Sequence, residues 1–135
     1  MAYLNTLAGR SREGDPLSTL NGRGLLDVEA HTAGDTLLAT ETGTWHTNTG
    51  ASGTITIVLP AATVGLRFGF GLGAAQQLRI DPNGTETISL PSTGVPGAAG
   101  KYLVADAIGE NVELACIIAG NWSVLNYTGT WTAEA

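Results

Sequence analysis

Charged residues are scarce in this chain, and their scarcity argues against a helical protein. Only 13% of the 135 residues are charged, whereas glycine alone fills 19 positions. Long surface helices normally carry many Glu, Lys and Arg side chains. We therefore predict strands joined by turns, in a single domain whose length permits a substantial buried core.

Cysteine and long apolar runs are also nearly absent. The one cysteine, Cys116, has no disulfide partner within the chain, and its mostly apolar neighbours predict a buried thiol. No apolar run approaches the ~18 residues that a membrane helix requires, and the N-terminus lacks the charged-then-apolar order of a signal peptide. These absences predict no membrane partner and synthesis in a cytoplasm.

Positive charge is the third shortage. The chain has 6 Lys and Arg residues against 12 Asp and Glu residues, which gives a net charge of −6. Contacts with phosphate groups need clustered cations. We therefore expect no nucleic-acid partner.

Glycine and proline divide the chain into two parts. Residues 1–34 are interrupted by Gly and Pro too often for a sustained helical or alternating pattern, which predicts an extended, irregular N-terminal arm. The arm still contains large apolar side chains that need a partner to cover them. Its candidate partner-binding residues are Tyr3, Leu4, Leu7, Leu17 and Leu20.

Residues 35–135 have the pattern of a β-domain. Short apolar-rich segments alternate there with turn residues. Eight strands are predicted, at residues 36–40, 54–59, 66–70, 78–81, 86–90, 102–105, 112–118 and 122–127. The fold class that follows is all-β: an antiparallel sandwich, jelly roll or barrel of about eight short strands.

Two turns predict specific hairpins. In the sequence DPNG at residues 81–84, Pro fixes φ and Gly accepts a positive φ, so residues 78–80 are expected to fold back on residues 87–89. The pair Gly120 and Asn121 fits a two-residue hairpin loop between the last two long strands. The register of that second hairpin would pair Ile118 with Ser123, Cys116 with Leu125 and Leu114 with Tyr127.

The second hairpin would be apolar on both faces. In the predicted register, Ile117, Trp122 and Val124 share the face opposite to Cys116. An antiparallel sheet with one face in water usually alternates apolar and polar residues. This second face would therefore meet either another layer of the same subunit or another subunit, and Ile117, Trp122 and Val124 are the candidate subunit contacts.

The search for catalytic and metal-binding patterns identifies no site. His31 and His46 lie in polar or Gly-containing segments without a Cys or His at metal-ligand spacing, so we interpret them as surface residues. Asp81, Asn83 and Thr85 alternate as calcium ligands do, but the bidentate Glu of a calcium loop is missing and turn chemistry explains them. We predict no enzyme, no cofactor and no metal ligand.

Several segments resemble the β-modules of bacteriophage and prophage structural proteins. They are residues 53–65 (GTITIVLPAATVG), 78–86 (LRIDPNGTE), 120–124 (GNWSV) and 129–131 (GTW), and the similarity covers residues 50–132. Such modules occur in tail fibres, spikes and particle surface proteins, often as trimers. A self-contained module with an adhesive arm is most similar to a capsid decoration, or cement, protein.

The resemblance implies a function and a partner. A decoration protein would sit on the virion surface, bind the major capsid protein and stabilise the shell, here as a homotrimer. The alternative is a tail-fibre, spike or head-fibre module that binds a glycan of the host surface, for which the chain offers three tryptophans.

Overall fold

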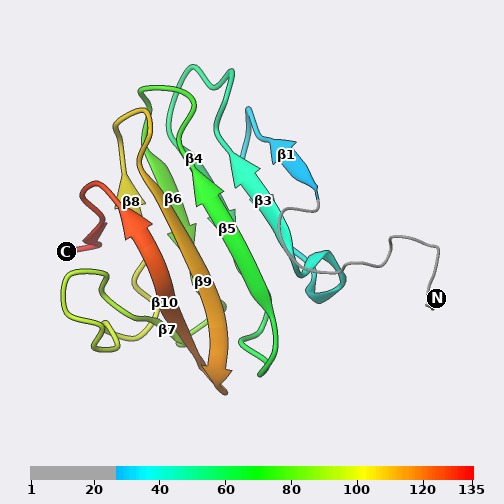
Figure 1. Ribbon diagram of the computed structural model, residues 1–135, viewed down its shortest axis with the longest axis vertical. Coiled ribbons are helices and arrows are strands. Elements are labelled where there is room, and N and C mark those ends of the chain that lie inside the picture. The colour runs from blue at the N-terminus through cyan, green and yellow to red at the C-terminus, as the bar shows by residue number, and fades with distance from the viewer. Residues whose placement is uncertain (1–26) are drawn as a thin grey trace, which may run out of the picture.

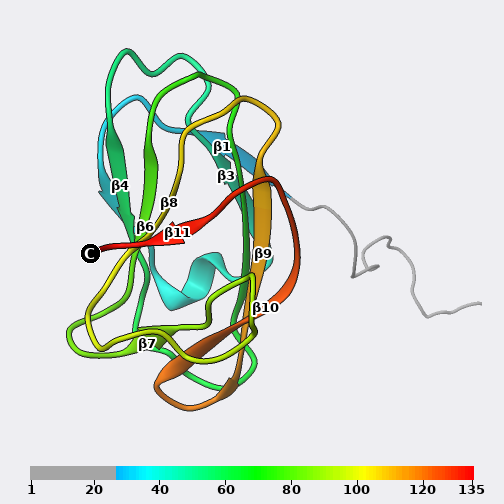
Figure 2. The same ribbon diagram turned by 90° about the vertical axis from the view of Figure 1, so that its left-hand side faces the viewer.

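Two β-sheets face each other in the computed structural model, which describes residues 27–135 (Figures 1 and 2). Sheet A has six strands in the order β1-β3-β5-β9-β10-β7, and sheet B has five in the order β11-β8-β6-β4-β2. The strands are β1 (Val28–Ala30), β2 (Asp35–Thr36), β3 (Thr44–Thr47), β4 (Ile55–Val58), β5 (Arg67–Gly71), β6 (Leu78–Asp81), β7 (Thr87–Ile88), β8 (Leu103–Ala105), β9 (Asn111–Ile118), β10 (Asn121–Thr128) and β11 (Thr132–Ala133). The predicted all-β class is confirmed. Within the described residues the helical element is one short 3₁₀ turn, η1 (Ala39–Glu41), and no helix is long and apolar enough to cross a membrane.

The first six strands wind back and forth between the two sheets. They alternate between the sheets, so that β1, β3 and β5 run parallel in sheet A while β2, β4 and β6 run parallel in sheet B. Figure 2 shows the layers from the side, with β4 and β6 in one layer and β3 in the other. Both sheets therefore contain parallel and antiparallel pairs, whereas the sequence analysis predicted antiparallel sheets. The parallel pairs arise because each connection crosses to the opposite sheet instead of making a hairpin.

Alternating apolar residues from both sheets fill the space between the layers. In β4, Ile55 and Ile57 are buried while Thr56 and Val58 are only partly so, as the period of two predicts. In β5, Phe68 and Phe70 are fully buried and face Ile80 and its neighbours of sheet B within one cluster. The core is therefore one contiguous layer between the sheets.

The DPNG turn forms, but the hairpin predicted from it is wrong. Asn83 accepts a hydrogen bond from the backbone N–H of Glu86 at 3.0 Å, and Gly84 has φ +57°. The chain then leaves sheet B: β6 lies between parallel β4 and antiparallel β8, whereas β7 pairs in parallel with β10 of sheet A. The turn chemistry thus fixes the reversal of the chain but not the strand that pairs after it.

The second hairpin exists, with a register that differs from the prediction. Ile118 pairs with Asn121, so the loop is Ala119 and Gly120, and Gly120 supplies its positive φ of +87°. A register shift after this pair then places Val124 opposite Leu114. A shift of a single residue exchanges the two faces of a strand.

This exchange moves Trp122 and Val124, which the predicted register placed on the face opposite to Cys116, to the same face as Cys116. Trp122 is fully buried and packs on Phe68, with ring centroids 5.7 Å apart, and Val124 packs against the same core. Cys116 is buried as predicted. Leu125 and Tyr127, which the predicted register placed on the same face as Cys116, are exposed.

Sheet A begins within the segment that the sequence assigned to the arm. Residues 28–30 form β1 and pair with β3, so the β-structure extends at least this far toward the N-terminus. The arm residues proposed for partner binding lie outside the described residues: Tyr3, Leu4, Leu7, Leu17 and Leu20.

Candidate functional site

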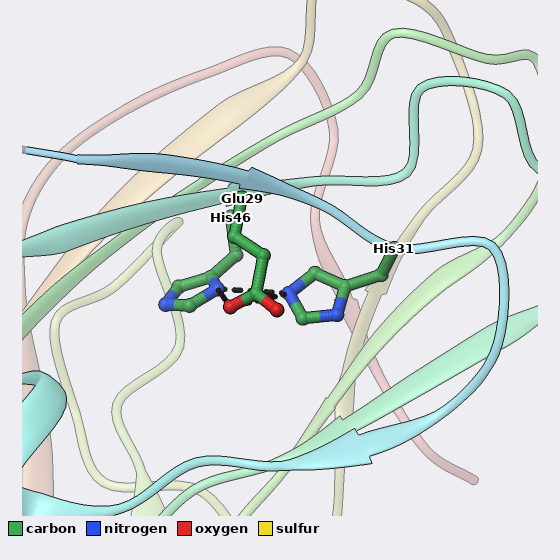
Figure 3. A group of neighbouring side chains, drawn as sticks. All are labelled: Glu29, His31 and His46. Atoms are coloured by element: carbon green, nitrogen blue, oxygen red, sulfur yellow. Dashed lines mark hydrogen bonds and ion pairs between the residues drawn. The ribbon is translucent and has the colours of Figure 1, made fainter.

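Three potential metal ligands lie close together beside β1, the edge strand of sheet A. Parallel pairing of β1 with β3 puts Glu29 directly beside His46. His31 follows Glu29 by two residues and therefore projects from the same face of β1. Figure 3 shows the three side chains converging, and their potential ligand atoms all lie within 4.8 Å of one another.

The two imidazole rings are buried and in direct contact. His31 and His46 are 6% and 1% exposed, and the Nε2 atom of His31 lies 2.9 Å from the Nδ1 atom of His46. The ring of His46 also packs against Phe68 and Phe70. The prediction of surface histidines is therefore wrong.

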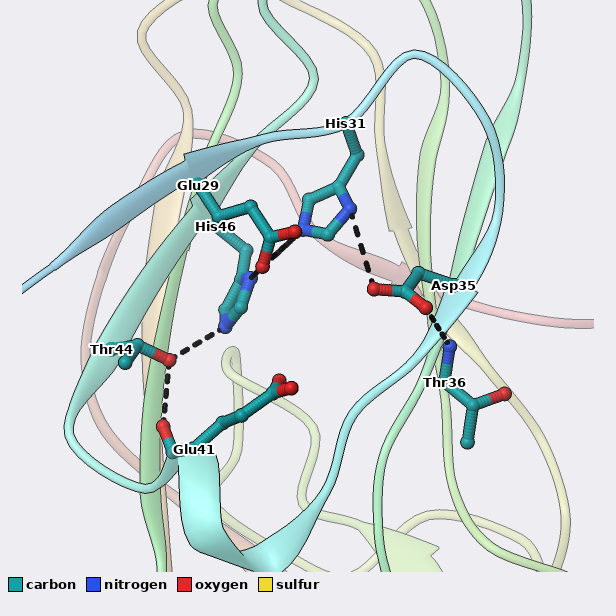
Figure 4. A network of polar contacts seen from close by, with 7 residues as sticks. All are labelled: Glu29, His31, Asp35, Thr36, Glu41, Thr44 and His46. Atoms are coloured by element: carbon teal, nitrogen blue, oxygen red, sulfur yellow. Dashed lines mark hydrogen bonds and ion pairs between the residues drawn. The ribbon is translucent and has the colours of Figure 1, made fainter.

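The hydrogen bonds around His46 indicate which of its ring nitrogens carries the proton. The hydroxyl of Thr44 donates its one proton to the carbonyl oxygen of Glu41 at 2.7 Å, and its oxygen lies 2.8 Å from Nε2 of His46 (Figure 4). That oxygen can only accept from His46, so Nε2 carries the proton. The Nδ1 atom of His46 then presents its lone pair to His31 and Glu29.

The surroundings keep His46 neutral. Burial, and next the nearby His31, lower the pKa of His46 from 6.5 to about 4, although the Asp35 carboxylate opposes this shift. A neutral imidazole is the form that can accept a hydrogen bond or coordinate a cation.

Carboxylates flank the histidine pair on two sides. An oxygen of Glu29 lies 3.8 Å from both His31 Nε2 and His46 Nδ1, and the Glu29 side chain is 55% exposed. On the other side, Asp35 of β2 places an oxygen 3.8 Å from His31 Nδ1. The arrangement thus joins both sheets, and a third carboxylate, Glu41, has a buried Oε1 atom with no hydrogen-bond partner among the described residues.

The sequence analysis did not identify this cluster, although two of its three members are close together in the sequence. The alternation of Glu29 and His31 is visible in the sequence and places both on one face of a strand. The third member, His46, joins them only because β1 and β3 pair in parallel with Glu29 opposite His46. That register is a tertiary property, and the predicted antiparallel pattern excluded it.

The three predicted subunit contacts are not brought together. Trp122 is in the core and Val124 packs against it, on the same face as Cys116 and not on the opposite face that the predicted register gave them. Ile117 is 62% exposed. The same hairpin exposes further large apolar side chains, namely Ile118, Leu125 and Tyr127.

The remaining sequence candidates have structural roles. Asn83 and its neighbours form the turn described above, and Trp131 is buried and donates its indole N–H to the carbonyl oxygen of Asn111 at 3.0 Å. A pocket of about 200 Å³ beside β8 is lined by uncharged residues and one carboxylate, Asp106.

No protein-family model matches this chain, and no curated protein is similar enough to count as its relative.

Proposed function

We propose that this chain is a structural module of a bacteriophage particle, most similar in role to a capsid decoration protein. It would bind the major capsid protein on the virion surface and stabilise the shell by adding buried interface. The sequence segments that resemble phage β-modules support this proposal.

The observation that carries the proposal is the exposed apolar hairpin of β9 and β10. Ile117 and Ile118 are 62% and 64% exposed, and Leu125 and Tyr127 are 49% and 43% exposed. Exposed large apolar side chains gathered on one element are typical of surfaces that another protein covers. A homotrimer contact and a capsid contact are the two uses that we propose for this hairpin.

The tryptophans weigh against the alternative of glycan binding. Trp122 is fully buried, Trp131 is 6% exposed, and Trp45 lies over Gly69 with its ring in contact with the backbone. Stacking on a sugar ring needs an exposed aromatic face. Tyr127 is the aromatic side chain of the described residues with substantial exposure, and a capsid surface therefore fits better than a glycan.

The arm is proposed as the anchor. Ordering a segment of chain on a partner costs roughly 1–2 kcal/mol per residue in backbone entropy, so the apolar side chains proposed as arm contacts must bury substantial area there. The test is deletion of residues 2–24, which leaves β1 in place. We expect the thermal transition of the β-domain to change little and binding to undecorated particles to be lost; binding equal to that of the full chain would contradict the anchor.

Copy number separates the two phage roles. Quantitative mass spectrometry of particles purified from the host that encodes this chain should find hundreds of copies for a shell protein, and a few to a few dozen for a fibre or spike. Light scattering of the purified protein tests the trimer, and a monomer mass at micromolar concentration, both free and after release from particles, would contradict it.

A further inference from the structure

We propose that Glu29, His31 and His46 bind one divalent transition-metal ion, for which Zn²⁺ is the best match. The site lies at the β1 edge of sheet A, where β5 separates β1 and β3 from the exposed hairpin of β9 and β10. Two imidazoles and one carboxylate form a ligand set that suits Zn²⁺.

The distances between the three ligand atoms are close to those of a tetrahedral site. They form a triangle with one edge of 2.9 Å between the two nitrogens and two edges of 3.8 Å to the Glu29 oxygen. A tetrahedral Zn²⁺ ion with bonds of about 2.0–2.1 Å holds its ligand atoms about 3.3 Å apart. Each edge therefore needs to change by about half an ångström. The exposed Glu29 side chain can shorten its two edges, whereas the edge between the nitrogens lengthens only if the two buried rings separate.

An outer hydrogen bond already orients the His46 ring, and a carboxylate lies 3.8 Å from the outer nitrogen of His31. A histidine that binds a metal through one nitrogen usually donates its other N–H to a carboxylate, carbonyl or similar acceptor. His46 donates from Nε2 to Thr44, which in turn donates to the Glu41 carbonyl, and this leaves Nδ1 for the ion. His31 has Asp35 beside Nδ1, which leaves Nε2 for the ion (Figure 4).

The placement of the cluster gives the ion a structural consequence. Glu29 lies within the edge strand β1 and His31 directly follows it, His46 lies on β3 of the same sheet, and Asp35 of sheet B lies beside His31. An ion bound there would link β1 to its neighbour in sheet A, β3. Three protein ligands leave a fourth position for water or for a donor from a partner.

The test is calorimetric titration of the full-length protein with ZnCl₂ after treatment with EDTA. We expect one ion per chain and a higher midpoint of thermal unfolding when Zn²⁺ is in excess. Glu29→Gln should weaken binding at least about tenfold, and Asp35→Asn should weaken it about tenfold through the orientation of His31. The matched control is Asp106→Asn, which removes an exposed carboxylate outside the cluster and should leave affinity unchanged.

A second measurement does not depend on any variant. The chain contains only two histidines, so their imidazole NMR signals report this site alone. Both sets of signals should shift together with saturation at one equivalent of Zn²⁺, and Co²⁺ in place of Zn²⁺ should give the strong visible absorption of a tetrahedral site. Unshifted histidine signals, or the same Zn²⁺ affinity for Glu29→Gln as for Asp106→Asn, would overturn the proposal.

Discussion

The indole ring of Trp45 lies directly over Gly69, its register partner on the neighbouring strand of sheet A. A Cβ atom built on Gly69 would overlap three carbon atoms of that ring. The glycine is therefore required by close packing and not by backbone conformation. It lets a large aromatic side chain cover the backbone of β5 on the outer face of the sheet.

We expect Gly69→Ala to lower the free energy of unfolding by about 1–3 kcal/mol, because Trp45 must move away from the sheet. Gly53→Ala is the matched control, since a Cβ atom there would meet nothing within 4 Å. Urea denaturation followed by tryptophan fluorescence measures both. If the two variants are equally stable, Trp45 does not rest on Gly69.

Two substitutions on the β9–β10 hairpin compare the contribution of a core residue to stability with that of a surface residue. Trp122 is fully buried against Phe68, so Trp122→Ala should cost about 3–5 kcal/mol of stability. Ile117→Ala, five residues earlier and 62% exposed, should change the stability of the isolated subunit by less than about 0.5 kcal/mol. Thermal unfolding at low protein concentration measures both values. A large loss for Ile117→Ala that grows with protein concentration would indicate that a second copy covers this residue.

The parts of the fold that follow local rules were predictable from the sequence. The alternation at Ile55 and Ile57 identified a core strand, and the glycine at position 120 identified a hairpin. The faces of that hairpin were not predictable, because bulges move Trp122 and Val124 to the inner side. A bulge depends on packing around the strand and leaves no fixed sequence signal.

Pairing between distant strands was the second limit. The residues of β6 and β7 look like a hairpin locally, yet they belong to different sheets. The same limit hid the candidate site, since His46 meets Glu29 and His31 only through the parallel register of β1 and β3. Assigning both histidines to the surface was a judgement about local polarity that long-range pairing overrode.

The thiol of Cys116 should react slowly in the folded protein. It is 2% exposed, and burial raises its pKa, so little reactive thiolate is present near neutral pH. Its S–H also donates to the carbonyl oxygen of Ile118 at 3.2 Å. Absorbance with an aromatic disulfide reagent should show slow labelling in buffer and rapid labelling in denaturant. Fast labelling in buffer would mean that the end of β9 opens readily.

Glu110 should make stability depend on acid pH. Its carboxylate accepts backbone N–H groups of Asp106, Ala107 and Thr130 at 3.1, 2.9 and 2.7 Å, which joins the 106–110 turn to the loop before β11. Burial alone would raise the pKa of Glu110, but these three hydrogen bonds outweigh it and hold the pKa below its ordinary value of 4.5.

The sign of the effect follows from that lowered pKa. The folded state binds the Glu110 proton less readily than the unfolded chain, so the stabilisation is complete above the unfolded pKa of 4.5 and is lost as the pH falls through the folded value. Glu110→Gln should therefore cost on the order of 1 kcal/mol at neutral pH, after allowance for partial exposure to solvent. Urea denaturation at a series of pH values should show this difference between wild type and variant shrinking as the pH falls below 4.5. A difference that stays constant over that range would mean that the three backbone donors do not depend on the ionised carboxylate.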